Sequence, residues 1–146
     1  MKPSTLLKLF SCATLLFPFV ADALEMPQEK LGLWEMRQQN SSNGGPLTAP
    51  YTMQYCVTTE LLETVRKATE EKSKNCSKNE VRKEGSKWIQ NSICKSAGIT
   101  MSSQTTHEIL GENAYHFDTN GTFDPPLARV SRSHVVRDGK WLGPCK

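Results

Sequence analysis

The three histidines, His107, His116 and His134, are the residues in this chain best suited to bind a metal ion. If a hairpin turns through Gly111-Glu112, His107 lies opposite His116 on the neighbouring strand. Two cross-strand imidazoles can begin a site for copper, zinc or nickel, with His134 as a third ligand. A one-residue change in the turn removes this pairing, and polar strand faces carry histidines that bind nothing. The favoured interpretation is therefore a solvated sheet face, with a metal site as the alternative.

Four of the five cysteines lie beyond residue 23, at positions 56, 76, 94 and 145. Residues 1–23 have the pattern of an export signal, described below, and an even number of cysteines in a short exported chain predicts two disulfides. A hairpin centred on Gly85 would place Cys76 opposite Cys94, and Cys56 would then pair with Cys145 and tie down the end of the chain. Zinc is the alternative, but no Cys-x-x-Cys knuckle is present.

Aromatic residues occur on nearly every expected strand. A curved sheet either packs them into a core or leaves a pocket between them for a small apolar ligand. A domain of this size needs most of them in its core, so a pocket is the alternative interpretation. The residues that would line such a pocket are Trp34, Tyr55, Trp88, Tyr115 and Phe117.

Basic residues gather in the middle of the chain, where they could dock an acidic partner in a cell envelope. Glutamates are interleaved with them, which favours a charge-mixed, solvated surface instead. The net charge of the whole chain is only +3 at pH 7, and no nucleic-acid partner is implied. The basic set comprises Lys72, Lys74, Lys78, Arg82, Lys83 and Lys87.

Catalytic motifs are absent from the sequence. There is no Gly-x-Ser-x-Gly elbow, helical metal-ligand pair or phosphate-binding loop, and two disulfides would leave the mature chain no free thiol. No cofactor is expected. A hydrolase-type enzyme without a linear motif is the third choice of function, because active sites need not leave such motifs.

The first 23 residues have the pattern of an export signal. Lys2 and Lys8 are followed by an apolar run over residues 9–20, which is too short for a membrane span of about 20 residues. Small residues then predict cleavage after Ala23, leaving a single disulfide-bonded domain over residues 24–146 with no transmembrane segment. A lipid anchor on Cys12 is the rival, but Phe10 is bulky where a lipoprotein signal needs a small residue.

Two strands are expected early in the mature domain. Alternation over residues 31–38 predicts a strand with Trp34 and Met36 turned inward. A loop rich in turn formers follows over residues 40–46, and residues 51–57 predict the second strand.

An amphipathic helix follows, capped by Thr58 or Thr59. It should have about three to four turns and lie on the sheet through an apolar stripe. The stripe consists of Leu61, Leu62, Val65 and Ala68.

The second half of the chain predicts an antiparallel meander. Hairpins are expected around Gly85 and Gly111, and a last strand near residues 130–137 should turn at Asp138-Gly139, with an interruption at residues 124–126. The predicted fold class is α+β: a curved antiparallel sheet or partial barrel of about six to seven strands with one amphipathic helix.

Several segments together resemble the family known as domain of unknown function 3617. They are residues 32–36 (Gly-Leu-Trp-Glu-Met), Cys56, the Cys76 to Cys94 hairpin with Trp88, and residues 141–146 (Trp-Leu-Gly-Pro-Cys-Lys). Trp141 departs from the shorter residue that members often have there. The resemblance covers nearly the whole mature chain and implies a periplasmic or secreted protein of a Gram-negative bacterium. It implies no activity.

The expected function is a non-catalytic binding or interaction module of the cell envelope. The runner-up is a carrier of a small apolar ligand or a metal ion in a β-sheet pocket. The expected partner is an envelope protein or a small apolar ligand.

Overall fold

The computed structural model describes residues 26–146, so the predicted export signal over residues 1–23 and the rival lipid anchor lie outside the described residues. One helix and seven strands follow in the order β1 (Gly32–Ser42), β2 (Tyr51–Val57), α1 (Thr59–Ser73), β3 (Cys76–Glu84), β4 (Lys87–Ser96), β5 (Ile99–Ile109), β6 (Ala114–Leu127) and β7 (Val130–Gly143). The expected antiparallel sheet with a single helix is present in this region, although strands make up most of it.

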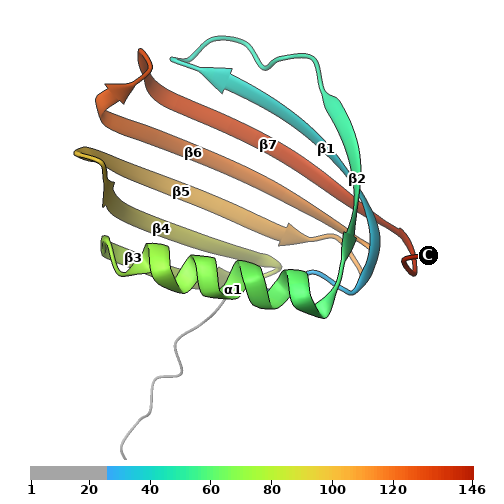
Figure 1. Cartoon of the computed structure of the whole chain (residues 1–146). Helices are drawn as coiled ribbons and strands as arrows, with labels where there is room; N and C mark the ends of the chain where they lie inside the picture. Colours follow the sequence, from blue (N-terminus) through green and yellow to red (C-terminus); the bar gives the residue numbers. More distant parts are fainter. Residues whose placement is uncertain (1–25) are drawn as a thin grey trace, which may run out of the picture.

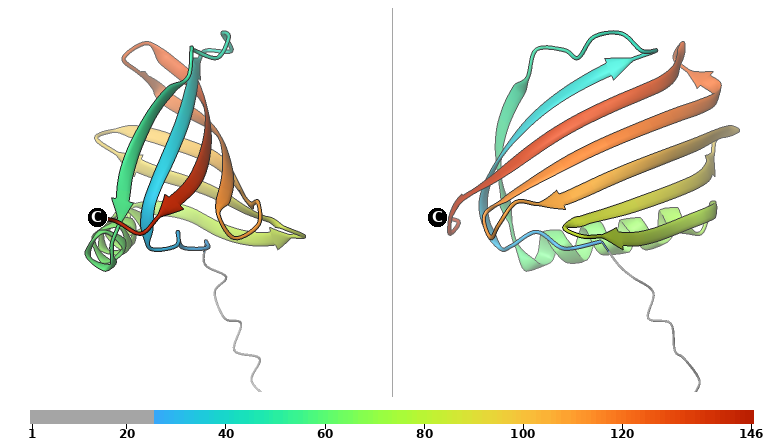
Figure 2. Two further views of the ribbon diagram at one scale, coloured as in Figure 1. Left: turned by 90° about the vertical axis from the view of Figure 1, so that its right-hand side faces the viewer. Right: turned by 180° about the vertical axis from the view of Figure 1, so that it is seen from behind.

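The seven strands form one open antiparallel sheet in the order β2-β1-β7-β6-β5-β4-β3. Strands β3 to β7 are a meander, and β1 inserts between β7 and β2. The edge strands are therefore β2 and β3, which are the two strands that α1 connects. The sheet is strongly curved, and α1 runs along its open side (Figure 1; Figure 2).

Strand β1 confirms the predicted alternation. Trp34 and Met36 retain only 3% and 8% of their exposure, and they face the same side as Tyr55 of β2, which lies opposite Trp34. The strand runs further than expected, to Ser42, because β7 pairs with it along its full length. The turn residues from Asn40 onward therefore begin inside the strand, not in a loop.

Helix α1 begins where the sequence indicates. The Thr58 side chain accepts a hydrogen bond from the Leu61 backbone N–H over 3.1 Å. The expectation that the apolar stripe lies on the sheet is largely wrong, because no residue of α1 is buried and Val65 remains 53% exposed. Of the stripe residues, only Leu62 packs against the core cluster, which consists of Trp34, Val57 and Tyr115. These core residues and Leu62 mark the concave face of the sheet.

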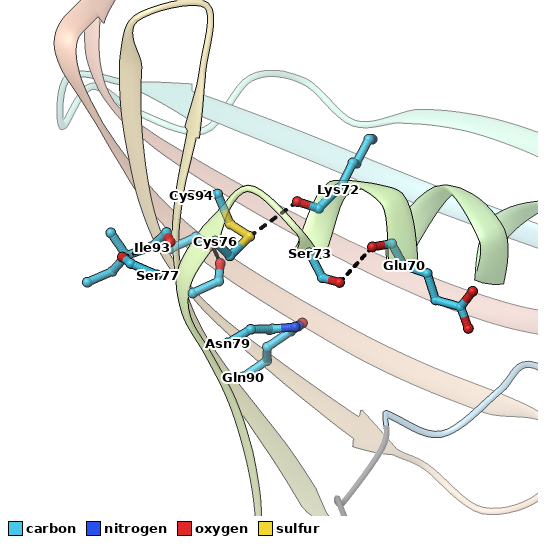
Figure 3. Close-up of a disulfide and its surroundings, with 11 residues drawn as sticks. Glu70, Lys72, Ser73, Cys76, Ser77, Asn79, Gln90, Ile93 and Cys94 are labelled. Atoms are coloured by element: carbon cyan, nitrogen blue, oxygen red, sulfur yellow. Dashed lines mark hydrogen bonds between the residues drawn. A yellow bond between two sulfur atoms is a disulfide. The ribbon is translucent and has the colours of Figure 1, made fainter.

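The hairpin of β3 and β4 carries one of two disulfides. Its turn uses Gly85 and Ser86, so that Glu84 lies opposite Lys87, and a bulge before Lys78 then brings Cys76 opposite Cys94. The Cys76–Cys94 disulfide lies at the end of α1, with the Cys76 sulfur 3.5 Å from the Lys72 carbonyl oxygen (Figure 3).

The second disulfide joins Cys56, at the end of β2, to Cys145 near the C-terminus. Their Cα atoms are 5.9 Å apart, within the usual range for a disulfide. The bridge fixes the last residues of the chain to an edge strand, and the pairing of all four cysteines is the one that the sequence favoured.

The last strand corrects one prediction. Strand β7 does not turn at Asp138-Gly139 but continues to Gly143, paired with β6 as far as Lys140 and with β1 as far as Gly143. Gly139 is required because the Tyr115 ring covers it: a Cβ at this position would lie 2.1 Å from the ring. The expected interruption near Pro125 is present, since the register of β6 against β7 breaks between Thr122 and Leu127.

The core is small for a domain of this size. Among the described residues, the buried hydrophobic side chains are Trp34, Met36, Val57, Ile89 and Tyr115, and His107 is the buried polar one. Within the same region, no helix has the length and apolar character needed to cross a membrane.

Candidate functional site: a pocket on the concave face

An aromatic cluster occupies one end of the concave face. Trp34 and Tyr115 pack with ring centroids 5.3 Å apart, Tyr115 meets Phe117 edge to face at 5.3 Å, and Tyr55 packs against the same group. These four come from β1, β2 and β6. All were predicted from the sequence to line a pocket, but only Trp34 and Tyr115 line the pocket described below. Trp88, the fifth predicted residue, lies on β4, 6.4 Å from the His107 ring.

His107 lies in the centre of this cluster. Its imidazole stacks on Phe117 with centroids 4.0 Å apart and planes inclined by 18°, and it meets Tyr115 edge to face at 5.8 Å. The residue is 1% exposed, and neither ring nitrogen has a hydrogen-bond partner. Burial lowers the pKa of His107 to about 4, so the imidazole is neutral near pH 7.

An orphaned imidazole is unusual because buried polar groups are almost always hydrogen-bonded. A neutral imidazole has one N–H donor and one acceptor nitrogen, and both are unused here. The site therefore offers a donor and an acceptor in a largely apolar setting.

The segment before β1 folds over the same end of the concave face. The Trp34 indole N–H donates to the Lys30 carbonyl oxygen over 2.7 Å, and the Trp141 indole N–H donates to the Leu31 carbonyl oxygen over 3.1 Å. The Lys30 ammonium lies 3.1 Å from Asn113 Oδ1 and 3.8 Å from the centre of the Trp141 ring. We call residues 28–31 the strap, because these contacts fasten them across the sheet.

Glycine at position 32 allows this arrangement. Gly32 has a φ of +134°, and a Cβ there would lie 2.2 Å from Trp141 Nε1. Any other residue would push the Trp141 indole away from the strap carbonyl that it binds.

Two tyrosines link the strap to the core. The Tyr55 hydroxyl lies 2.9 Å from both Glu29 carboxylate oxygens and 2.9 Å from the Tyr115 hydroxyl. Since the single Tyr55 proton is donated to Glu29, Tyr115 donates to the Tyr55 oxygen. Burial, followed by these hydrogen bonds and the Glu29 charge, raises the pKa of Tyr55, and burial raises the pKa of Tyr115 to about 12. Both phenols remain protonated at physiological pH.

A pocket of about 400 Å³ lies between the strap and the sheet. This volume is at the lower end of the range for small-molecule sites. Its wall is mainly apolar, and His107 is part of it. The lining residues are Gln28, Glu29 and Lys30 of the strap together with Trp34, His107, Ile109, Gly111, Glu112, Ala114 and Tyr115.

The predicted pairing of His107 with His116 is wrong. The turn after β5 takes one residue more than expected, so that His107 lies opposite Phe117 and His116 lies opposite Glu108. His116 and His134 therefore lie on the convex face, where they contact Asp138 at 2.7 Å and Asp118 at 2.9 Å. The three histidines do not converge, and the described region contains no cluster of three or more side chains suited to hold a metal ion.

The six basic residues lie at the C-terminal end of α1 and on β3 and β4, where most are paired with carboxylates. Lys78 contacts Glu80 at 3.2 Å, and Arg82 contacts Glu84 at 2.8 Å. Lys74 and Lys87 have similar glutamate partners, and the Lys83 ammonium lies over the Trp88 ring. This pairing weakens any positive field that the set would otherwise produce.

The fold and the pocket define a disulfide-bonded, open antiparallel sheet with a strapped pocket at one end of its concave face. Residues 27–145 match the family model described as "Protein of unknown function (DUF3617)", so the chain belongs to this family. No curated protein and no solved structure matches the chain.

Several pocket residues were not predicted. Glu29 and Lys30 lie just after the predicted export signal and belong to no motif, and Ile109 and Glu112 flank a turn whose length the sequence does not specify. His107 was singled out as a metal ligand, but its inward orientation depends on that same turn.

Proposed function

We propose that this protein is an exported, non-catalytic binding module that takes a small, mainly apolar ligand into the pocket beneath the strap. The observation that carries this proposal is His107, which is 1% exposed, has no hydrogen-bond partner and forms part of the pocket wall. A buried polar group without a partner destabilises the fold, and such a group at a pocket is accounted for by a ligand that satisfies it.

Export is supported by two features of the chain. The first 23 residues have a charged start, an apolar run and small residues before the cleavage position. Two disulfides join the four remaining cysteines, and disulfides persist mainly in oxidising compartments such as the periplasm or the extracellular medium.

Binding without catalysis is supported by the surroundings of His107. A histidine that acts as a general base in a triad is oriented by a carboxylate and contacts a nucleophile. Neither nitrogen of His107 has such a neighbour, and stacking on Phe117 holds the ring in an apolar environment. This environment suits recognition of an apolar molecule.

A second candidate function is docking of an envelope protein on the exposed apolar side chains of α1 and β2. The favouring observation is the exposure of apolar side chains on these two elements, including Leu61 at 39% and Val65 at 53% on α1, and Met53 at 46% on the rim of the concave face at the edge strand β2. This surface and the strapped pocket are on different residues, so the two functions can be tested separately.

The first test is binding of N-phenyl-1-naphthylamine, a neutral fluorescent probe of apolar sites. We expect saturable binding to the mature disulfide-bonded protein, its loss in Ile109→Trp, which fills the pocket, and its retention in the matched control Ile109→Val. An absence of saturable binding to the wild type, or equal binding to both variants, would contradict the proposal. Native mass spectrometry of protein recovered from its own host then distinguishes a retained small molecule from a copurified protein partner.

A further inference from the structure

The geometry points to an uncharged amphiphile as the ligand of the strapped pocket: an apolar body with a hydroxyl or amide group that hydrogen-bonds to His107. This inference rests on the proposed function and adds the chemistry that the pocket selects. It assigns His107 as the residue that determines specificity.

The hydrogen-bonding capacity of the site comes from one side chain. His107 has one donor and one acceptor, and both are unused. Each nitrogen exposes less than 1 Å², so a ligand in the pocket bonds to His107 only after the side chains that cover the ring shift. A hydroxyl group can accept from the N–H and donate to a second acceptor, or donate to the free nitrogen, and an amide can do either. A carboxylate can only accept a hydrogen bond from the His107 N–H, and an ammonium can only donate to the other nitrogen. Each of these charged groups can therefore use only one of the two ring nitrogens.

The charges around the pocket disfavour an anionic head group. Its lining includes two carboxylates, Glu29 and Glu112, and one ammonium, Lys30. The ammonium is already held by Asn113 Oδ1 and the Trp141 ring. His107 is neutral near pH 7 and stacked on Phe117, so it does not balance a negative charge buried in the pocket.

The walls of the pocket suit an apolar body of moderate size. Trp34 and Tyr115 are buried on one side, and Ile109 continues the apolar surface towards the turn after β5. The hydroxyl groups of Tyr55 and Tyr115 are occupied with each other and with Glu29. Both phenol protons are therefore committed, and neither tyrosine donates to the ligand head group.

The inference is tested with three probes that share a ten-carbon chain: 1-decanol, decanoate and decylammonium, each below the concentration at which it aggregates. Displacement of N-phenyl-1-naphthylamine at neutral pH gives the three affinities. We expect 1-decanol to bind at least about tenfold more tightly than decanoate, because moving an unpaired charge from water into this mainly apolar pocket is strongly unfavourable. Decylammonium should also bind more weakly than 1-decanol.

The variant His107→Phe tests the assigned residue. It should still bind N-phenyl-1-naphthylamine, while its affinity for 1-decanol falls about tenfold because the hydroxyl is buried without a partner. His116→Phe, on the convex face, is the matched control and should leave all affinities unchanged. His107→Leu repeats the test with a smaller side chain, in case phenylalanine itself fills the pocket.

The outcomes separate the inference from the proposed function. If the naphthylamine probe does not bind the wild type, the proposed function fails. If it binds but decanoate or decylammonium equals or exceeds 1-decanol, or if both His107 variants retain the wild-type affinity for 1-decanol, the assignment of an uncharged ligand to His107 is wrong and the binding function stands.

Discussion

Replacing His107 with phenylalanine should stabilise the protein, and the gain should grow as the pH falls. In the wild type the imidazole is buried with both nitrogens unpaired. An unsatisfied buried polar group costs about 1–3 kcal/mol, and the phenyl ring retains the stacking on Phe117 without this penalty. The expected gain in the free energy of unfolding near pH 7.5 is therefore about 1 kcal/mol or more.

The pH dependence follows from the lowered pKa. In the unfolded chain a histidine takes up a proton as the pH falls through about 6.5, whereas folded His107 does so only near 4. Between these values the unfolded state binds the extra proton, so the wild type loses stability as the pH falls. At pH 4.5 the loss amounts to about 2–3 kcal/mol relative to pH 7.5.

Urea unfolding followed by tryptophan fluorescence, with both disulfides intact, measures the free energy of unfolding of the wild type and the variant at each pH. Other groups titrate in the same range, so the informative quantity is the difference between the variant and the wild type at each pH. That difference should increase by about 2–3 kcal/mol from pH 7.5 to pH 4.5 for His107→Phe and for His107→Leu. An unchanged difference for both variants would refute the claim that His107 is buried and uncharged.

Three further predictions concern the fold. Replacing both cysteines of the long-range bridge, Cys56→Ser with Cys145→Ser, should lower the free energy of unfolding by about 1 kcal/mol more than replacing both cysteines of the hairpin bridge, because it opens a longer loop. Equal urea midpoints for the two double variants would count against this. Gly139→Ala should destabilise by about 1–3 kcal/mol by displacing the Tyr115 ring, which near-ultraviolet circular dichroism detects as a lost aromatic signal. Thr58→Ala should cost about 1 kcal/mol in thermal unfolding through loss of the helix cap, and an unchanged midpoint would show that the cap is not needed.

Much of the architecture could be predicted from local sequence patterns. The alternation around Trp34 and Met36, the cap at Thr58 and the glycine turn at Gly85 each encode an element through its own residues. The extent to which helix α1 is exposed could not be predicted in this way. An apolar stripe shows which side a helix offers to a partner, but not how closely a curved sheet approaches it.

The register of the strands was the main limit for the site. In the hairpin after Ile109, one additional turn residue exchanges the two faces of a strand, and it carries His107 inward and His116 outward. In the Gly85 hairpin the two-residue turn shifts the register by one, but the bulge beside Cys76 shifts it back. The disulfide pairing was therefore predictable, whereas the histidine pairing was not.

Gly139 shows the same limit for a single residue. Asp-Gly is a common turn signal, yet here it lies within a continuous strand. Its role depends on Tyr115 of the neighbouring strand, a contact between positions that no local pattern relates.

The most direct test of the central claim is a long-range ¹H–¹⁵N NMR spectrum of the three imidazoles, recorded near pH 6 before and after addition of 1-decanol. We predict a neutral His107 without hydrogen bonds in the free protein, and a shift of its nitrogen resonances on ligand addition. His116 and His134, on the convex face, should not respond. A His107 resonance that is protonated at pH 6, or that stays unchanged at saturating 1-decanol, would contradict a ligand site built around this residue.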